Sequence, residues 1–168
     1  TGGAHGMVDR KWFADLAART GAAAVTDLTS AYTTIGIWGP QAREVLASLT
    51  SADVSHETFG LGTSRTIEMD SLSVLASRIS YVGELGWELY VPMEQGARLW
   101  DTLWEAGAPH SLTACGIGVY ATTGRLEKGY RAHGAELELE YDLVEAGMAR
   151  PKVKAADFVG KAALLAMQ

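Results

Sequence analysis

The spacing of apolar residues changes at Pro92, and this change constrains the fold more than any other feature of the chain. From Trp87 to Val91, apolar and polar side chains alternate, which is the period of a strand with one buried face. From Met93 to Ala106, apolar residues recur every three or four positions, as on an amphipathic helix. The sequence therefore predicts a strand that leads directly into a helix.

The rest of the chain predicts further strands and helices in mixed order. Hairpins outnumber strand-helix-strand units, which favours an α+β fold in which helices pack on one face of an antiparallel sheet. A single domain of 168 residues is large enough to bury a hydrophobic core. The other expected strands are 23–27, 32–38, 64–69 and 72–81, and the other expected helices are 8–20, one that opens at Pro40, 114–128 and 158–167.

Composition and charge argue against several classes of function. The net charge of −6 opposes binding to a phosphate backbone, so nucleic acid is not an expected partner. No run of 18 apolar residues is present to span a membrane, and no membrane partner is expected. Cys115 is the single cysteine and has no Cys/His cluster around it, so neither a disulfide nor a metal site is expected. A reducing, cytoplasmic setting is the default expectation.

The stretch RISYVGELGWELYVP, residues 78–92, places a lone carboxylate on a predicted strand. If Trp87 faces the core, alternation turns Glu88 toward the opposite face. On one interpretation, Glu88 belongs to the polar surface of a half-buried sheet. On the other it lies in a pocket, where Tyr81 on the facing arm of the hairpin stacks on a flat heterocycle and Glu88 accepts two parallel N–H bonds from it. Spacing alone does not decide between the two.

Three further blocks stand beside this stretch: DLTSAYTTIGIWGPQAREVL at 27–46, GRLEKGYRAHGAEL at 124–137, and LVEAGM with FVGKAAL at 143–148 and 158–164. Together with the hairpin stretch, they resemble the folate-dependent aminomethyltransferase family in residues and in order. That family includes the T-protein of glycine cleavage and the C-terminal parts of dimethylglycine and sarcosine dehydrogenases. The residues of the hairpin stretch and of RLEKGYRAHG are more similar to the dehydrogenase branch.

The resemblance implies a ligand and roles for three residues. The family binds tetrahydrofolate, and the matching positions make Tyr81 and Tyr130 aromatic contacts of the pterin and Glu88 the carboxylate that holds it. The resemblance also implies ferredoxin-like elements in the fold. It implies one-carbon transfer from a methylamine-type donor to tetrahydrofolate, giving methylenetetrahydrofolate, and association with a flavin dehydrogenase domain or subunit.

The resemblance further sets expectations about parts of the family that residues 1–168 leave out. The catalytic Asp of the family is expected before Thr1 and its C-terminal barrel after Gln168, so the chain is interpreted as one partial folate-binding domain with no catalytic residue assigned. Ala121 stands where glycine-cleavage members carry an Arg that helps to hold the ligand. Two alternatives stay open: a non-catalytic folate-binding or assembly module, and a tetrahydrofolate-dependent demethylase. Turnover to methylenetetrahydrofolate would separate an enzyme from a binding module.

Overall fold

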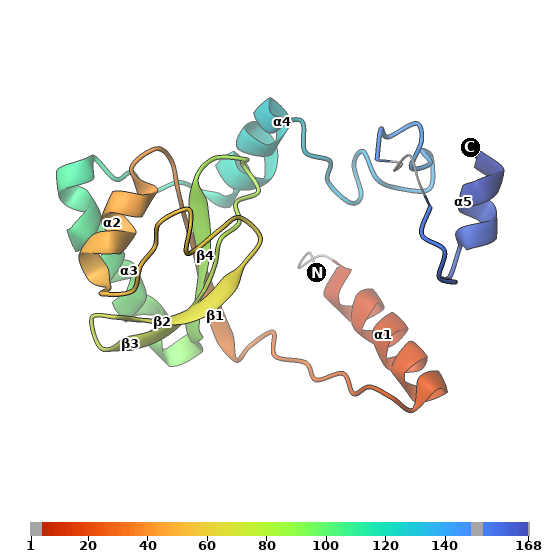
Figure 1. The fold of residues 1–168 in the computed structure, drawn as a ribbon, viewed down its shortest axis with the longest axis horizontal. Coiled ribbons are helices and arrows are strands. Elements are labelled where there is room, and N and C mark those ends of the chain that lie inside the picture. The colour runs from red at the N-terminus through yellow and green to blue at the C-terminus, as the bar shows by residue number, and fades with distance from the viewer. Residues whose placement is uncertain (1–4, 149–152, 168) are drawn as a thin grey trace.

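The structure, a computed structural model, describes residues 5–148 and 153–167. Its centre is a four-stranded antiparallel sheet with the strand order β1-β4-β3-β2 (Figure 1). The sheet with its helices confirms the predicted α+β class. The strands are β1 (Tyr32–Trp38), β2 (Ser64–Met69), β3 (Leu72–Ser77) and β4 (Gly86–Pro92).

Two helices pack against the sheet and against each other. α2 (Ala42–Leu49) follows β1, and α3 (Gly96–Gly107) follows β4 through the short 3-10 helix η2 (Met93–Gln95). Both helices contact β4, and they contact each other, so they cover the same face. The change of apolar spacing at Pro92 thus marks the junction of strand and helical segment, as the sequence predicts.

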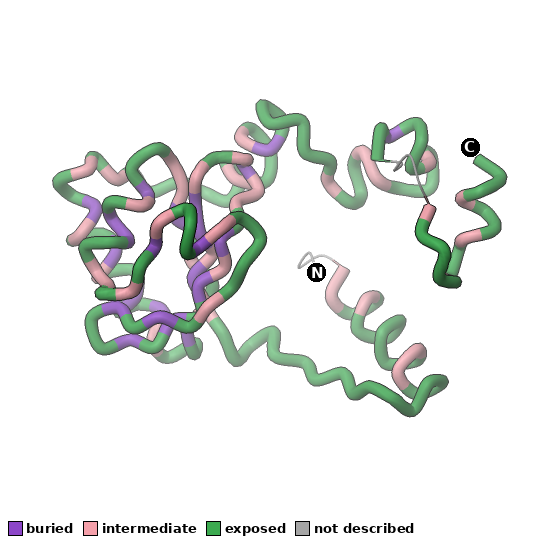
Figure 2. Tube along the Cα trace, in the orientation of Figure 1, coloured by how far each residue is buried: buried purple, intermediate pink, exposed green. Residues whose placement is uncertain are grey.

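The hydrophobic core lies between the sheet and these two helices (Figure 2). Trp87 is fully buried there, and its ring centroid lies 6.0 Å from that of Phe59. The predicted alternation holds along β4, because Trp87, Leu89 and Val91 are buried while the residues between them are half-buried. Other side chains with almost no exposed surface are Leu46, Met69, Leu72, Val74 and Leu99.

Two predicted elements differ in kind from what the structure shows. Residues 23–27 were predicted to form a strand, and they form none. This segment is exposed and rich in Ala, which is depleted in strands, so neither burial nor propensity supports a strand there. The helix predicted over 114–128 is irregular, with a π-helix η4 (Val119–Gly124) that continues into α4 (Arg125–Lys128).

The strand predicted over 72–81 is too long, because β3 ends at Ser77. The backbone of the next residue, Arg78, still bonds to the residues that directly precede β2, whereas the pairing of β3 with β4 ends at Ser77. Its N–H donates to Thr63 O at 2.8 Å, and its carbonyl accepts from the N–H of Gly62 at 3.0 Å. Tyr81 therefore lies in a turn and not on a strand that faces β4, which corrects the predicted hairpin geometry.

The first and last helices lie apart from the sheet (Figures 1 and 2). α1 (Gly6–Thr20) ends at Gly21, which has a φ of 63°, and α5 spans Lys161–Met167. Neither contains a buried residue. Trp12 and Phe13, two large apolar side chains of α1, are 50% and 48% exposed. Among the described residues, no helix has both the length and the apolar character needed to cross a bilayer.

Candidate functional site

Glu88 lies on the sheet face opposite the core. On β4 it is paired with Gly36 of β1 on one side and with Ser77 of β3 on the other. Its neighbour Trp87 is fully buried, whereas Glu88 is half-buried. Alternation along the strand therefore delivers the carboxylate to the face that α2 and α3 leave open, as the sequence predicts.

Two tyrosine hydroxyls hold this carboxylate. Tyr90 Oη donates to Glu88 Oε2 at 2.5 Å, and Tyr120 Oη donates to Glu88 Oε1 at 2.6 Å. The backbone N–H of Tyr81 donates to Tyr120 Oη at 2.9 Å. Because an N–H group only donates, the Tyr120 proton is left for Glu88. Each carboxylate oxygen accepts one of these bonds and keeps a further lone pair for a ligand.

Both hydroxyls are held in the protonated form. Burial, followed by the hydrogen bond to Glu88, raises the pKa of Tyr90 to about 12. Burial and then the bond to Glu88 also raise the pKa of Tyr120 above its ordinary value. The two groups are therefore hydrogen-bond donors at neutral pH, which is the role in which they orient Glu88.

A groove of about 570 Å³ opens beside Glu88. Its walls include Trp38 at the end of β1, Trp100 of α3, and Tyr120. The rings of Trp38 and Tyr120 have centroids 5.1 Å apart and planes inclined by 54°. Gly36, directly opposite Glu88, lines the groove without a side chain. The volume lies within the range of small-molecule sites, roughly 300–1,000 Å³.

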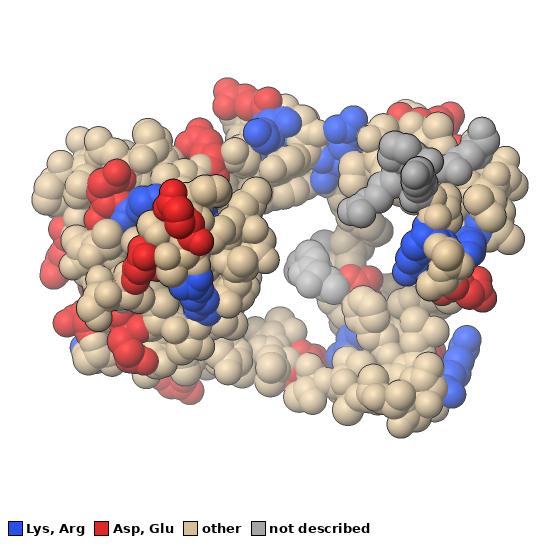
Figure 3. Space-filling model, viewed as in Figure 1, with Lys and Arg blue, Asp and Glu red and all other residues tan. Residues whose placement is uncertain are grey.

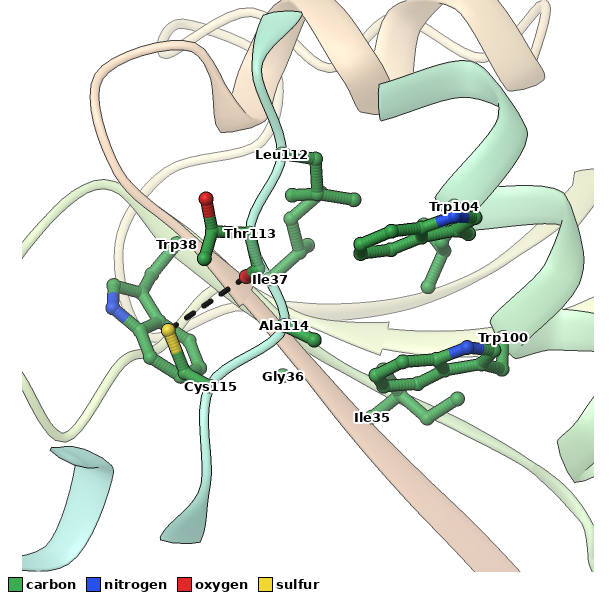
Figure 4. Close-up of a pocket in the computed structure, with 11 residues that line it drawn as sticks. Ile35, Gly36, Ile37, Trp38, Trp100, Trp104, Leu112, Thr113, Ala114 and Cys115 are labelled. Atoms are coloured by element: carbon green, nitrogen blue, oxygen red, sulfur yellow. Dashed lines mark hydrogen bonds between the residues drawn. The ribbon is translucent and has the colours of Figure 1, made fainter. Parts of the chain in front are cut away.

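A smaller pocket of about 90 Å³ shares part of this lining (Figure 4). Trp38, Trp100 and Cys115 line both. Trp100 and Trp104 stack with centroids 6.2 Å apart and planes within 7° of parallel. In Figure 4 the segment that carries Cys115 crosses β1 in the view, with Trp38 on one side of it and the stacked pair on the other. An apolar, aromatic surface therefore continues from the groove around the edge of the sheet.

Tyr81 and Tyr130, the other two residues predicted for the site, form a pair of their own. Their rings stack with centroids 5.9 Å apart and planes 19° apart, and the ring of Tyr81 lies 5.9 Å from that of Tyr120. The Tyr81 hydroxyl donates to Arg131 O at 2.5 Å. The structure thus brings all three predicted residues into one cluster. Tyr120 connects the pair to Glu88, and it is Tyr120 that lines the groove.

A buried arginine fixes the block that carries Tyr130. Arg125 is 6% exposed and donates to Ala121 O at 2.8 Å, to Tyr130 O at 3.0 Å and to Glu136 at 2.7 Å. The N–H of Ala132 donates to the same Glu136 oxygen at 3.0 Å. This N–H, together with Arg125, lowers the pKa of Glu136. The ion pair and its bonds hold the Tyr130 backbone in place beside Tyr81.

Charge in the groove is negative. Of the residues that line it, Glu88 alone carries a formal charge. On the face shown in Figure 3, acidic and basic side chains are interspersed over the body that contains the sheet. Within 5–148 and 153–167, no three or more His, Cys, Asp or Glu side chains are grouped to hold a metal ion. The arrangement suits a flat ligand that offers N–H donors to a carboxylate.

Comparison with known proteins decides the family. Residues 1–154 match the family described as the GCVT N-terminal domain. The chain belongs to this family. The match covers nearly the whole chain and confirms the resemblance seen in its sequence blocks. Within the GCVT family the chain resembles both dimethylglycine dehydrogenases and aminomethyltransferases.

Two relatives illustrate this range. The chain is 37% identical over 168 residues to the mitochondrial dimethylglycine dehydrogenase of Homo sapiens, with 98% of this chain and 19% of that protein covered. It is 36% identical over 158 residues to an aminomethyltransferase of Bacillus cereus (strain B4264), with 93% of this chain and 42% of that protein covered. The chain thus spans about a fifth of the length of the first and about two fifths of the second.

A solved structure shares the fold. The heterotetrameric sarcosine oxidase from Corynebacterium sp. U-96, in complex with pyrrole 2-carboxylate, matches with a TM-score of 0.51 and 23% identity. The match covers 60% of this chain and 51% of that chain. The α+β arrangement around the sheet is therefore one that this solved structure also contains.

Sequence reasoning missed the partners of Glu88. Tyr90 follows Glu88 by two positions, so alternation places both on one face, but nothing in the sequence indicates the hydrogen bond between them. Tyr120 is 32 residues from Glu88 and lies in a π-helix. No spacing rule connects it to β4, and only the three-dimensional structure brings it there.

Proposed function

We propose that this chain supplies a tetrahydrofolate-binding surface in an aminomethyltransferase-type protein. The observation that carries the proposal is the orientation of Glu88, whose two carboxylate oxygens each accept one tyrosine hydroxyl beside an aromatic groove. Family membership supports folate as the ligand class. Tyr81 and Tyr130 stay proposed contacts of the pterin, and the cluster they form with Tyr120 supports that role.

The residues present fit the pterin ring of tetrahydrofolate. A pterin offers a ring N–H and an exocyclic amine side by side, and the remaining lone pairs of Glu88 match these two donors. Trp38 and Tyr120 offer aromatic surface on which a flat ring packs. In this arrangement Glu88 sets the orientation of the ring, and the aromatic walls exclude water from it.

We propose that the reaction is one-carbon transfer from a methylated amine donor to tetrahydrofolate, giving methylenetetrahydrofolate. Tetrahydrofolate would supply the nitrogen that accepts the carbon. The described residues would bind tetrahydrofolate and orient it toward the donor, because holding two reactants close together in the right orientation lowers the reaction barrier without a covalent step on the protein. The names of the dimethylglycine dehydrogenase and sarcosine oxidase similar to this chain support a flavin dehydrogenase domain or subunit as the partner. That partner would oxidise the N-methyl group of the donor by two electrons, and the oxidised carbon would then pass to tetrahydrofolate. The cytoplasm is the compartment we propose, whereas the human relative is named as mitochondrial.

Calorimetric titration of tetrahydrofolate into wild type, Glu88→Gln and Glu84→Gln tests the proposal. Glu88→Gln keeps the shape of the side chain but loses the charge-assisted bonds, so binding should weaken by ~1.5–3 kcal/mol, roughly tenfold or more. Glu84 is exposed and lies outside the groove lining, so Glu84→Gln should bind as wild type does. Equal affinity of all three proteins, or no binding by wild type, would refute the proposal.

A further inference from the structure

Tyr120 occupies a place that neither the sequence pattern nor the family match explains. Its hydroxyl stands between the backbone N–H of Tyr81 and Oε1 of Glu88, at 2.9 and 2.6 Å. Its ring lines the groove. Among the residues that the structure describes, it is therefore the one tyrosine that both shapes the groove and contacts the carboxylate inside it, since Tyr90 does not line the groove.

The direction of the two hydrogen bonds follows from the donors. The Tyr81 N–H has no lone pair to offer, so Tyr120 Oη accepts from it and has its own single proton left for Glu88. With Tyr90 donating to the other oxygen, both carboxylate oxygens are fixed as acceptors on the side of the tyrosines. The remaining lone pairs of the Glu88 carboxylate accept hydrogen bonds from ligand N–H groups and repel a ligand carbonyl.

Local structure keeps Tyr120 in this position. It belongs to the π-helix η4 (Val119–Gly124), a distortion that turns a side chain away from the regular helical positions. Gly124 packs against Val82, because a Cβ at Gly124 would lie 2.4 Å from Val82 Cγ1. The π-helix is thereby held against the turn that contains Tyr81, and the N–H of Tyr81 has a fixed acceptor.

We propose that Tyr120 is a specificity-determining residue of the groove. By fixing the orientation of the Glu88 carboxylate, it makes the groove select ring ligands with two adjacent N–H donors and reject rings that place a carbonyl at the same edge. The proposal rests on the proposed function, because it names the ligand edge that the same site reads. Tyr120 acts through Glu88 and is in this sense a positioning residue.

Two probes that differ at this edge test the proposal. 6-Methyltetrahydropterin carries the amino-amide edge, and 6-methyltetrahydrolumazine carries a carbonyl where the pterin has its amine. We expect wild type to prefer the pterin by roughly tenfold or more, because the wrong ring sets a carbonyl against a carboxylate. In Tyr120→Phe the ratio of the two dissociation constants should fall by about fivefold. Tyr32→Phe, at an exposed position outside the groove lining, should keep the wild-type ratio.

The ratio of the two dissociation constants, for the pterin and for the lumazine, separates a role of Tyr120 in specificity from a role in folding. A merely structural change weakens both probes equally and leaves the ratio unchanged. Replacing Tyr120 by p-aminophenylalanine, which keeps a donor at the same place, should restore most of the preference for the pterin. An unchanged ratio in Tyr120→Phe would overturn the inference, while tetrahydrofolate binding by wild type would leave the proposed function standing. Equal binding of the two probes by wild type would also overturn the inference. Failure of wild type to bind any pterin would overturn both.

Discussion

At the scale of residues, the Tyr90 hydroxyl couples stability to pH. Its pKa is raised from 10.0 to about 12 in the folded state, chiefly by burial and then by the bond to Glu88. In the unfolded chain the pKa returns to its ordinary value, so between these two values the folded state keeps a proton that the unfolded state has lost. Tyr90 therefore makes its whole contribution to the free energy of unfolding at pH values below the pKa of the unfolded state. That contribution is lost as the pH rises through the pKa of the folded state.

Urea denaturation of wild type and Tyr90→Phe over this alkaline window measures the effect. The difference in unfolding free energy between the two proteins should shrink as pH rises from about 9 to about 12. Tyr32→Phe provides the matched control, because Tyr32 is 48% exposed and its difference from wild type should stay constant. A constant difference for Tyr90→Phe as well would show that its hydroxyl is not held by Glu88.

The same site shows how far single residues are predictable. Glu88 was placed on the open face by alternation alone, because a strand has only two faces and Trp87 takes the core. Tyr120 was beyond such reasoning, since its contact with Glu88 depends on how a distant π-helix packs. The predicted partnership of Tyr81 and Glu88 runs through the hydroxyl of that unpredicted residue.

At the scale of elements, β1 shapes the groove through a missing side chain. Gly36 pairs with Glu88, and a Cβ there would lie 3.4 Å from the Trp38 ring and 4.0 Å from Tyr120, which is ordinary contact. Gly36→Ala therefore fits and should bind tetrahydrofolate within about threefold of wild type. Gly36→Leu extends into the groove, and its binding should weaken by roughly tenfold or more. Calorimetry measures the two affinities, and circular dichroism shows whether both variants fold. Equal affinity of Gly36→Ala and Gly36→Leu for tetrahydrofolate would mean that the ligand does not bind in this groove.

Element bounds were predictable where pattern and burial agreed. β1 and β2 have the predicted bounds, because β-branched or alternating residues coincide there with a half-buried sheet surface. The prediction for residues 72–81 ran past Ser77, which is the last residue of β3 that pairs with β4. Apolar spacing does not report where the backbone pairing with a neighbouring strand stops, so the end of β3 was not visible in the sequence.

At the scale of the whole molecule, burial is concentrated in one part of the chain. The main core cluster extends from Ile37 to Leu103, and α1 and α5 contribute no buried residue (Figure 2). The Arg10–Asp27 ion pair, which ties α1 to the following segment, joins side chains that are 62% and 45% exposed. Solvent screens such a pair, so it contributes little to stability. The free energy of unfolding should therefore reside in the sheet, α2 and α3.

A truncation and a core substitution test this distribution. Removing residues 1–27 deletes α1 and leaves every member of the core cluster in place, so the free energy of unfolding should change by less than about 0.5 kcal/mol. Leu46→Ala on α2 empties a fully buried position and should lower it by roughly 2–5 kcal/mol. Urea denaturation followed by Trp fluorescence compares the two with wild type. If the truncation costs as much as Leu46→Ala, α1 contributes to the cooperative unit in spite of its exposure, and the stability of this chain does not follow the burial of its side chains.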